Sequence, residues 1–171
     1  MSSSGNSPSP RPTAFLDRDG TINVKAPEGD YVKSWDEFAF LPGAEEAVKL
    51  LAGAGWRVVV VTNQRGVALG RMAMSDVDDI HRRMREAVPV DAVYVCPHER
   101  DSCDCRKPGT GLFRQAMRDD PAIDPASSVV IGDAESDMLA GEAFGARTIL
   151  VGQPPLPSLL DAATRLVSSA G

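Results

Sequence analysis

The sequence predicts an α/β fold built on a doubly wound, Rossmann-like parallel sheet of about five core strands. Apolar strand patterns alternate with helical patterns along the chain, which is typical of such sheets. The run Val58-Val59-Val60-Val61 is continuously apolar, as expected of a strand buried on both faces. Polar residues stand where apolar strands end, at Asp17, Thr62 and Asp133, and sheets of this class carry their sites there.

Each predicted element rests on a local pattern. Apolar positions from Ala47 to Leu51 predict the first helix, and Gly55 follows as its stop. Ser75 is the expected N-cap of the second helix. The later strands are short apolar runs such as SSVVIGD at 127–133. In chain order we predict strands at 13–16, 57–62, 91–96, 127–133 and 147–151, helices at 44–54, 75–87, 110–118, 135–144 and 156–167, and a short extended piece at 38–41.

Length and composition predict a single domain. The 171 residues suffice for one well-covered core, so we expect one domain over 13–171. Residues 1–12 are rich in Ser, Pro and Gly and lack the apolar region of a signal peptide, so a disordered tail is expected. No apolar run reaches the roughly 18 residues of a membrane span.

Charge and cysteine content narrow the class of protein. The formal net charge of −6 makes nucleic acid a poor partner, because phosphate backbones need a basic face. The three cysteines lie close together with no distant partner for a disulfide, which favours a reducing, cytoplasmic location and metal ligation. We therefore expect a cytoplasmic monomer that uses neither nucleic acid nor membrane.

The segment Asp17-Arg18-Asp19-Gly20-Thr21 directly follows the first predicted strand. Two carboxylates in this spacing can converge on one point, where Mg²⁺ would find the oxygen ligands that it prefers. Asp17 could then attack a phosphorus atom while Asp19 protonates the leaving alkoxide and later activates water. An ordinary strand-end turn, in which Asp and Gly are common, is the alternative.

Three further groups of residues could act on the same phosphate as this segment. Thr62 and the amides after it can donate to phosphoryl oxygens, and Lys107 can neutralise charge on the transferring group. Asp133 can ligate a metal, with Asp137 supporting it. Taken singly, each has an ordinary interpretation as a turn, a surface cation or an acidic helix start.

The segment Cys96-x-His98-x₄-Cys103-x-Cys105 contains all three thiols and one of the two histidines. Three thiolates and one imidazole match a closed structural Zn²⁺ site, and four protein ligands leave no open position for catalysis. Incidental buried cysteines are the alternative. The loop ends at Arg106-Lys107, so its expected purpose is to position these two cations.

As a set, these motifs resemble the haloacid dehalogenase superfamily of phosphotransferases. The resemblance runs from about Thr13 to Val151 and rests on Asp17 with Asp19, Thr62, Lys107, and Asp133 with Asp137. It implies that Asp17 forms an aspartyl-phosphate, that Thr62 and Lys107 hold the phosphoryl group, and that Mg²⁺ binds Asp17, the Asp19 carbonyl and Asp133. The gaps between the motifs are too short for a large cap domain, so a capless site with loop-borne specificity is expected.

The zinc loop resembles that of two related families, the heptose 1,7-bisphosphate 7-phosphatases and the histidinol-phosphate phosphatases. The segments 29–32 and 63–68 are similar to the heptose family, which implies a sugar phosphate substrate. Ala134, where many heptose enzymes have Lys, and the short linker after His98 keep the histidinol family open. A non-catalytic receiver-like phospho-acceptor is the alternative from another class. The expected substrate-binding residues are Gly29, Asp30, Tyr31, Asn63, Gln64, Arg65 and Arg106.

Overall fold

The computed structural model of the protein describes residues 11–170. Most of the tail expected at 1–12 therefore lies outside the described residues. Within them the elements are β1 (Thr13–Leu16), η1 (Trp35–Glu37), α1 (Ala44–Gly53), β2 (Arg57–Asn63), α2 (Arg65–Ala68), α3 (Met74–Ala87), β3 (Ala92–Cys96), α4 (Gly111–Asp119), η2 (Pro125–Ser127), β4 (Ser128–Gly132), α5 (Glu135–Phe144), β5 (Arg147–Leu150) and α6 (Leu159–Ser169).

The strands form one five-stranded sheet in the order β3-β2-β1-β4-β5, and every neighbouring pair is parallel. The predicted α/β class and strand number are thus confirmed. The chain moves from β1 outward through β2 and β3, then crosses to β4 and β5 on the other side. The order therefore reverses at β1, and Asp17 follows β1 directly at this switch point.

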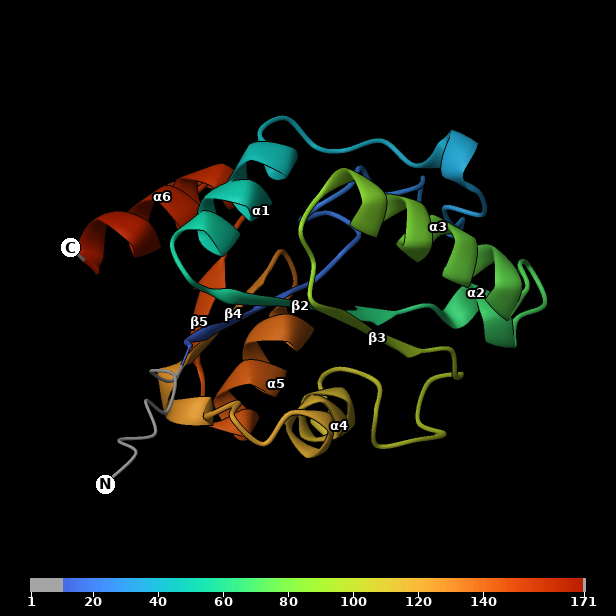
Figure 1. The fold of residues 1–171 in the computed structure, drawn as a ribbon. Coiled ribbons are helices and arrows are strands. Elements are labelled where there is room, and N and C mark those ends of the chain that lie inside the picture. The colour runs from blue at the N-terminus through green and yellow to red at the C-terminus, as the bar shows by residue number, and fades with distance from the viewer. Residues whose placement is uncertain (1–10, 171) are drawn as a thin grey trace, which may run out of the picture.

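Helices cover both faces of the sheet (Figure 1). Successive residues of β1 point to opposite faces of the sheet. Ala14 and Leu16 pack among residues of α1, α3 and α6 on one face. Phe15 points to the other face and packs against α4 and α5, with its ring 5.0 Å from that of Phe113 and 5.6 Å from that of Phe144. Burial on both faces accounts for the continuous apolar runs. Among residues 11–170, no helix has the length and apolar character that a bilayer crossing requires.

Local chemistry explains three of the differences between the predicted and the observed elements. Ser75 does not cap α3, because this helix begins at Met74 and the Asp76 carboxylate accepts the Ala73 N–H at 2.8 Å. The piece expected at 38–41 makes one isolated bridge, between Phe40 and Asn23. The last helix starts later than expected, at Leu159, where the Ser158 hydroxyl accepts the Asp161 N–H at 3.2 Å.

Candidate active site

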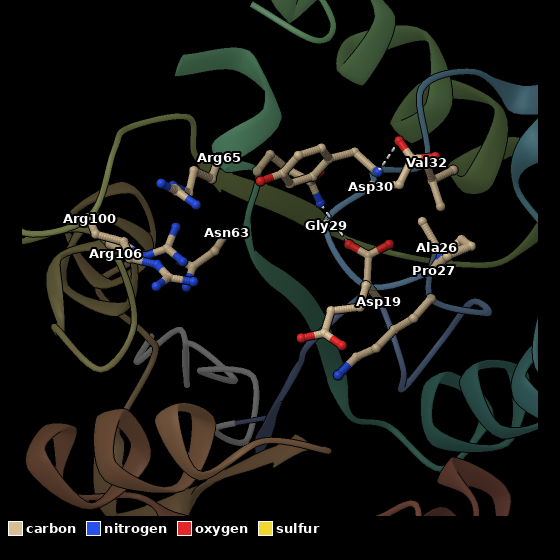
Figure 2. Close-up of a pocket in the computed structure, with 14 residues that line it drawn as sticks. Asp19, Ala26, Pro27, Gly29, Asp30, Val32, Asn63, Arg65, Arg100 and Arg106 are labelled. Atoms are coloured by element: carbon tan, nitrogen blue, oxygen red, sulfur yellow. Dashed lines mark hydrogen bonds between the residues drawn. The ribbon is translucent and has the colours of Figure 1, made fainter. Parts of the chain in front are cut away.

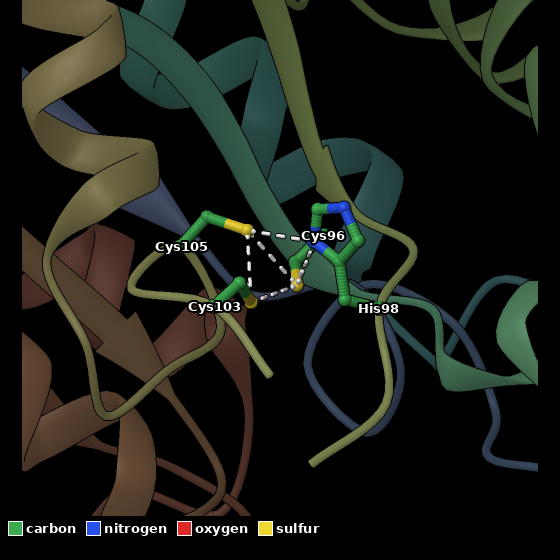
Figure 3. A group of neighbouring side chains, drawn as sticks. All are labelled: Cys96, His98, Cys103 and Cys105. Carbon is green, nitrogen blue, oxygen red and sulfur yellow. Dashed lines mark hydrogen bonds between the residues drawn. The ribbon is translucent and has the colours of Figure 1, made fainter. Parts of the chain in front are cut away.

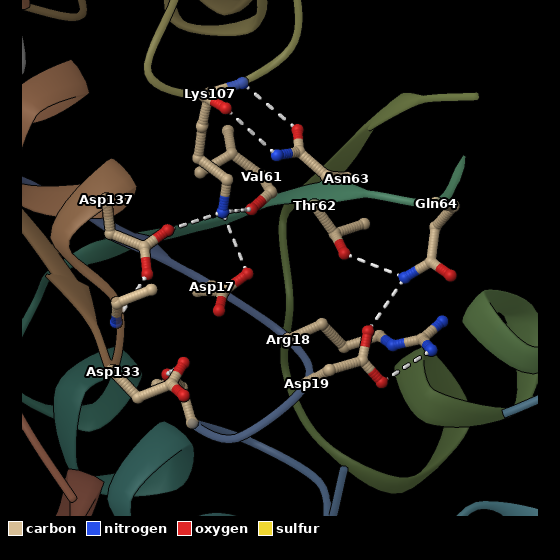
Figure 4. Close-up of polar contacts among 12 residues, drawn as sticks. Asp17, Arg18, Asp19, Val61, Thr62, Asn63, Gln64, Lys107, Asp133 and Asp137 are labelled. Atoms are coloured by element: carbon tan, nitrogen blue, oxygen red, sulfur yellow. Dashed lines mark hydrogen bonds and ion pairs between the residues drawn. The ribbon is translucent and has the colours of Figure 1, made fainter. Parts of the chain in front are cut away.

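Lys107 links the ends of three elements at the carboxyl edge of the sheet (Figure 4). Its ammonium donates to Asp17 Oδ1 at 2.8 Å, to Asp137 Oδ1 at 2.6 Å and to the Val61 carbonyl at 2.8 Å. Only 3% of Lys107 is exposed. Burial lowers its pKa, but the charges of Asp17 and Asp137 outweigh this effect and raise it, so the amine remains a cation.

Asp17 carries one carboxylate oxygen that Lys107 does not use. Burial raises the pKa of Asp17 to about 7, even though Lys107 lowers it, and the nearby Asp137 charge raises it further. Lys107 therefore compensates the negative charge of ionised Asp17 only in part. A bound cation or an electrophilic phosphorus would stabilise this charge further.

Asp133 approaches Asp17 from the end of β4. Its Oδ1 accepts the Thr21 hydroxyl at 3.4 Å, and its Oδ2 pairs with the Lys25 ammonium at 2.5 Å. Gly20, at φ +86°, permits this approach, because a Cβ there would overlap the Asp133 carboxylate and the Lys25 side chain.

The carboxylates of Asp17, Asp133 and Asp137 suit a hard divalent cation. One oxygen from each lies within 4.8 Å of the others. Asp137 already accepts Lys107 and the Ala134 N–H, at 2.6 and 3.1 Å. Asp17 has one oxygen that Lys107 does not use. The Asp133 oxygens have only a long contact to the Thr21 hydroxyl and a pairing with the largely exposed Lys25, which a metal could displace. The crowded negative charge fits Mg²⁺.

Asp19 lies beside this group in a different environment. Its oxygens accept Arg18 and Asn23 at Oδ1, both at 2.9 Å, and Gln64 at Oδ2, at 2.9 Å. Burial raises the pKa of Asp19, but the Arg18 charge and these three donors outweigh it and lower the pKa. The pKa values of Asp17 and Asp19 are therefore shifted in opposite directions, although only one residue separates them in the sequence.

The amides of Asn63, at the end of β2, and of Gln64, just after it, support neighbouring residues that were predicted to be catalytic. Gln64 donates to Thr62 Oγ1 as well as to Asp19, at 2.9 Å each, which leaves the Thr62 hydroxyl hydrogen free to donate. Asn63 pairs with the Lys107 backbone in both directions, at 3.1 and 3.2 Å. Both residues were predicted to bind substrate, and in this structure their amides serve Asp19, Thr62 and Lys107.

A cavity of about 400 Å³ opens beside Asp19 (Figure 2). All seven residues predicted to bind substrate line it, namely Gly29, Asp30, Tyr31, Asn63, Gln64, Arg65 and Arg106. Arg65 pairs with Glu99 of the cysteine loop. Buried Nη1 of Arg106 has no partner among the described residues. The cavity therefore offers guanidinium donors to an anion.

The four predicted zinc ligands converge (Figure 3). The sulfurs of Cys96, Cys103 and Cys105 lie 3.2–3.5 Å apart, and His98 Nδ1 lies 3.1 Å from Cys105 Sγ and 3.6 Å from Cys96 Sγ. A tetrahedral zinc with bonds of about 2.3 Å separates its sulfurs by about 3.8 Å. No disulfide joins any two of these three cysteines. The cluster is thus close to the size and composition of a closed zinc site.

Three features of the site were missed in the sequence. Lys25 reaches Asp133, Arg100 joins the cavity wall, and His81 contacts Arg18 from α3. Lys25 and Arg100 lie in irregular loops, where no periodicity indicates which way a side chain points. His81 lies between apolar positions on the buried side of a helix, and this was the one available signal.

Comparison with known proteins gives consistent similarities. A family model described as HAD-hydrolase-like matches residues 104–153, a segment that contains Lys107, Asp133 and Asp137. A Mycobacterium bovis protein named D-glycero-alpha-D-manno-heptose-1,7-bisphosphate 7-phosphatase is 45% identical over 130 residues, covering 72% of this chain and 68% of its own. The Escherichia coli D-glycero-beta-D-manno-heptose-1,7-bisphosphate 7-phosphatase is 37% identical, covering 92% of this chain and 89% of its own.

A solved structure is similar over nearly the same length. It is the D,D-heptose 1,7-bisphosphate phosphatase of B. bronchiseptica complexed with magnesium and phosphate. Its TM-score is 0.83 at 33% identity, and the alignment covers 92% of this chain and 99% of that one. The similarity therefore extends over nearly the whole of this chain.

Proposed function

The chain belongs to the haloacid dehalogenase-like family of heptose-bisphosphate phosphatases, and we propose that it removes the 7-phosphate of D-glycero-D-manno-heptose 1,7-bisphosphate in a Mg²⁺-dependent reaction. One observation carries the chemistry. The buried Lys107 ammonium joins Asp17 to Asp137 at the switch point of the sheet, next to a cavity lined by arginines. This arrangement supports a reaction in which a carboxylate nucleophile and a cation act on the same phosphoryl group.

We propose a two-step reaction on Asp17. One of its carboxylate oxygens attacks the phosphorus, the bond to the sugar oxygen breaks, and Asp19 gives a proton to the leaving alkoxide. Asp19 then takes a proton from the water that hydrolyses the aspartyl-phosphate. Because Asp19 is ionised in the free enzyme, it must gain its proton when the dianionic phosphate approaches, since a nearby negative charge raises its pKa. A phospho-acceptor without turnover has no use for this second carboxylate.

Thr62 and Lys107 are proposed to hold the transferring group. The Thr62 hydroxyl has a hydrogen to donate, because Gln64 occupies its oxygen as an acceptor. Lys107 supplies positive charge that the fold has already removed from water, so little reorganisation is needed when charge develops. Asn63 fixes the Lys107 backbone and thereby the start of this side chain.

Two metal ions complete the proposal. Asp17, Asp133 and the backbone carbonyl of Asp19 would hold Mg²⁺, which neutralises phosphoryl oxygens and orients them for in-line attack. Cys96, His98, Cys103 and Cys105 would hold a structural Zn²⁺ that fixes the loop leading into Arg106 and Lys107. We further propose a cytoplasmic monomer in which residues 13–171 act as one domain.

The rim of the cavity is proposed to select the substrate. A heptose bisphosphate presents a second phosphate, which Arg106 can bind through planar, paired donors, with Arg65 and Arg100 beside it. Histidinol phosphate presents a cationic amine instead, and these arginines would repel it. Gly29, Asp30 and Tyr31 face the same space, where they can contact sugar hydroxyls.

A phosphate-release assay tests the assignment. The panel contains both anomers of the heptose bisphosphate, because the relatives include enzymes named for each, together with a heptose monophosphate and histidinol phosphate. We expect the highest kcat/KM with a heptose bisphosphate. A higher value with histidinol phosphate would overturn the substrate assignment and leave the chemistry of Asp17 in place.

A further inference from the structure

Arg18 stands between Asp17 and Asp19 in the sequence, and its side chain is completely buried. Its Nη2 donates to Asp19 Oδ1 at 2.9 Å, and its Nη1 lies 3.0 Å from His81 Nε2. The guanidinium carbon also lies 5.9 Å from the centre of the Phe38 ring. One terminal nitrogen of the guanidinium thus contacts Asp19, the proposed general acid, and the other contacts His81 from α3.

The contact between Arg18 and His81 defines the state of the histidine. A guanidinium has donors and no acceptor, so Nε2 of His81 must accept, and the ring hydrogen must lie on Nδ1. His81 is only 6% exposed. Burial first, and then the Arg18 charge, lower the pKa of His81 to about 3, so the ring is neutral at ordinary pH.

We propose that His81 is a positioning residue of the phosphatase reaction, acting through Arg18 to aim the Asp19 carboxylate at the leaving oxygen. The proposal rests on the function proposed above for Asp19. His81 touches no reacting atom, but it holds Nη1 of Arg18, and so fixes where Nη2 presents its hydrogen to Asp19. Gln64 and Asn23 hold the same carboxylate from other directions.

The identity of the residue at 81 follows from this arrangement. A carboxylate there would pair with Arg18 and compete with Asp19 for the guanidinium. An apolar side chain would leave Nη1 buried without a partner, beside an Nε that already has none among residues 11–170. A neutral acceptor satisfies Arg18 and leaves its charge directed at Asp19, and imidazole is such an acceptor.

The test compares leaving groups. An alkoxide needs a proton to depart, whereas p-nitrophenolate leaves without one, so misplacing Asp19 should slow phosphoryl transfer to Asp17 only for the first. Hydrolysis of the aspartyl-phosphate needs Asp19 with either substrate, so the comparison uses single turnovers, which report the transfer step. We expect His81→Leu to slow phosphoryl transfer from a sugar phosphate by about 10- to 100-fold at saturation, with the half-saturating concentration nearly unchanged. The first-turnover release of p-nitrophenolate should slow by less than about threefold. His81→Gln retains a neutral acceptor and should recover most of the sugar phosphate rate.

Ile80→Val is the matched control, since Ile80 is buried on the same helix within the core and has no polar partner. It should leave the ratio of the two rates unchanged. Equal losses on both substrates in His81→Leu, or no loss on either, would overturn the inference. If neither substrate is hydrolysed by the unaltered enzyme, the proposed function itself has failed.

A second measurement needs no variant, and so it holds even if His81→Leu does not fold. Nitrogen NMR of the native protein should show His81 with a proton on Nδ1 and an unprotonated Nε2. That state should persist through the neutral range without titration. A proton found on Nε2 would contradict the contact with Arg18 and overturn the inference.

Discussion

The centre and the rim of this site lie side by side, yet their side chains differ in freedom. The Lys107 and Asp137 side chains that pair at the centre are each 2% exposed. The Arg65 and Glu99 side chains that pair at the rim are 29% and 43% exposed. Polar groups at the centre are therefore fixed before substrate arrives, whereas those at the rim can exchange partners with it.

This difference separates chemistry from selection. Strand ends and buried partners fix the atoms that transfer phosphate, which reduces the reorganisation needed in the transition state. Exposed arginines bind through charge that solvent partly screens, so each contributes less. Substitutions at the centre should act mainly on kcat, and substitutions at the rim mainly on KM.

The largest effect is expected at the nucleophile. Asp17→Asn removes the attacking carboxylate but keeps its shape, and should lower turnover by more than about 10⁴-fold. Asp19→Asn should lose about 10²- to 10⁴-fold, because an amide cannot carry the proton. Single-turnover assays with Mg²⁺ measure both losses, and circular dichroism checks the fold. Near-normal turnover by Asp17→Asn would exclude the covalent mechanism.

The zinc loop connects the two regions, and breaking it should give an intermediate effect. The native protein should contain about one zinc per chain, and Cys105→Ser should lose it and lower kcat by about 10- to 100-fold through Lys107. Metal analysis and kinetics test this together. Asp104→Asn alters the same loop at a side chain that is 82% exposed, and should retain both zinc and activity. Zinc-free native protein with full activity would contradict the prediction.

The difference between the centre and the rim also explains which parts of the site the sequence could predict. Asp17, Thr62 and Asp133 follow apolar strands, and the parallel register brings such ends together, so their convergence was predictable. The cysteine cluster was predictable because its ligands are close in sequence. The short helix α2 was not, since four residues give too little periodicity.

The contacts that were missed are tertiary. Nothing in the sequence near Lys25 indicates that its amine reaches Asp133, because this depends on a loop bending back over Gly20. The contact between His81 and Arg18 joins residues 63 positions apart and depends on where α3 packs. Periodicity placed His81 on a helix, but it could not show which polar group lies opposite.

At the rim, Arg106→Ala should act on KM. Loss of a charge-assisted donor should raise KM for the heptose bisphosphate by about tenfold, and change KM for a monophosphate much less. Only the bisphosphate loses a partner. Arg114→Ala removes an arginine outside the cavity whose side chain is 50% exposed, and should change neither value. Equal changes for both substrates would assign Arg106 to the reacting phosphate instead.

Metal affinity should depend on pH through Asp17. Burial raises its pKa to about 7, so below this pH Mg²⁺ must displace a proton, and above it the carboxylate is already ionised. Affinity should therefore fall by up to about tenfold per pH unit below 7, and level off above it. Calorimetry from pH 5.5 to 8.5 tests this. The weaker affinity of Asp17→Asn should vary much less over that range.

The smallest effect is expected at Lys25, which belongs to the rim but reaches into the centre. Its side chain is 55% exposed, and its ammonium sits on Asp133, whose side chain is 12% exposed. Asp133 is one of the residues proposed to hold Mg²⁺, so the metal would compete with this ammonium for the carboxylate. Because the Lys25 side chain is largely exposed, its pairing is weak, and Lys25→Met should tighten Mg²⁺ binding by only about two- to fivefold. Lys49→Met, on the exposed side of α1, should leave the affinity unchanged. A weaker affinity in Lys25→Met would mean that Lys25 assembles the metal site rather than competing for it, and would move this residue from the rim to the centre.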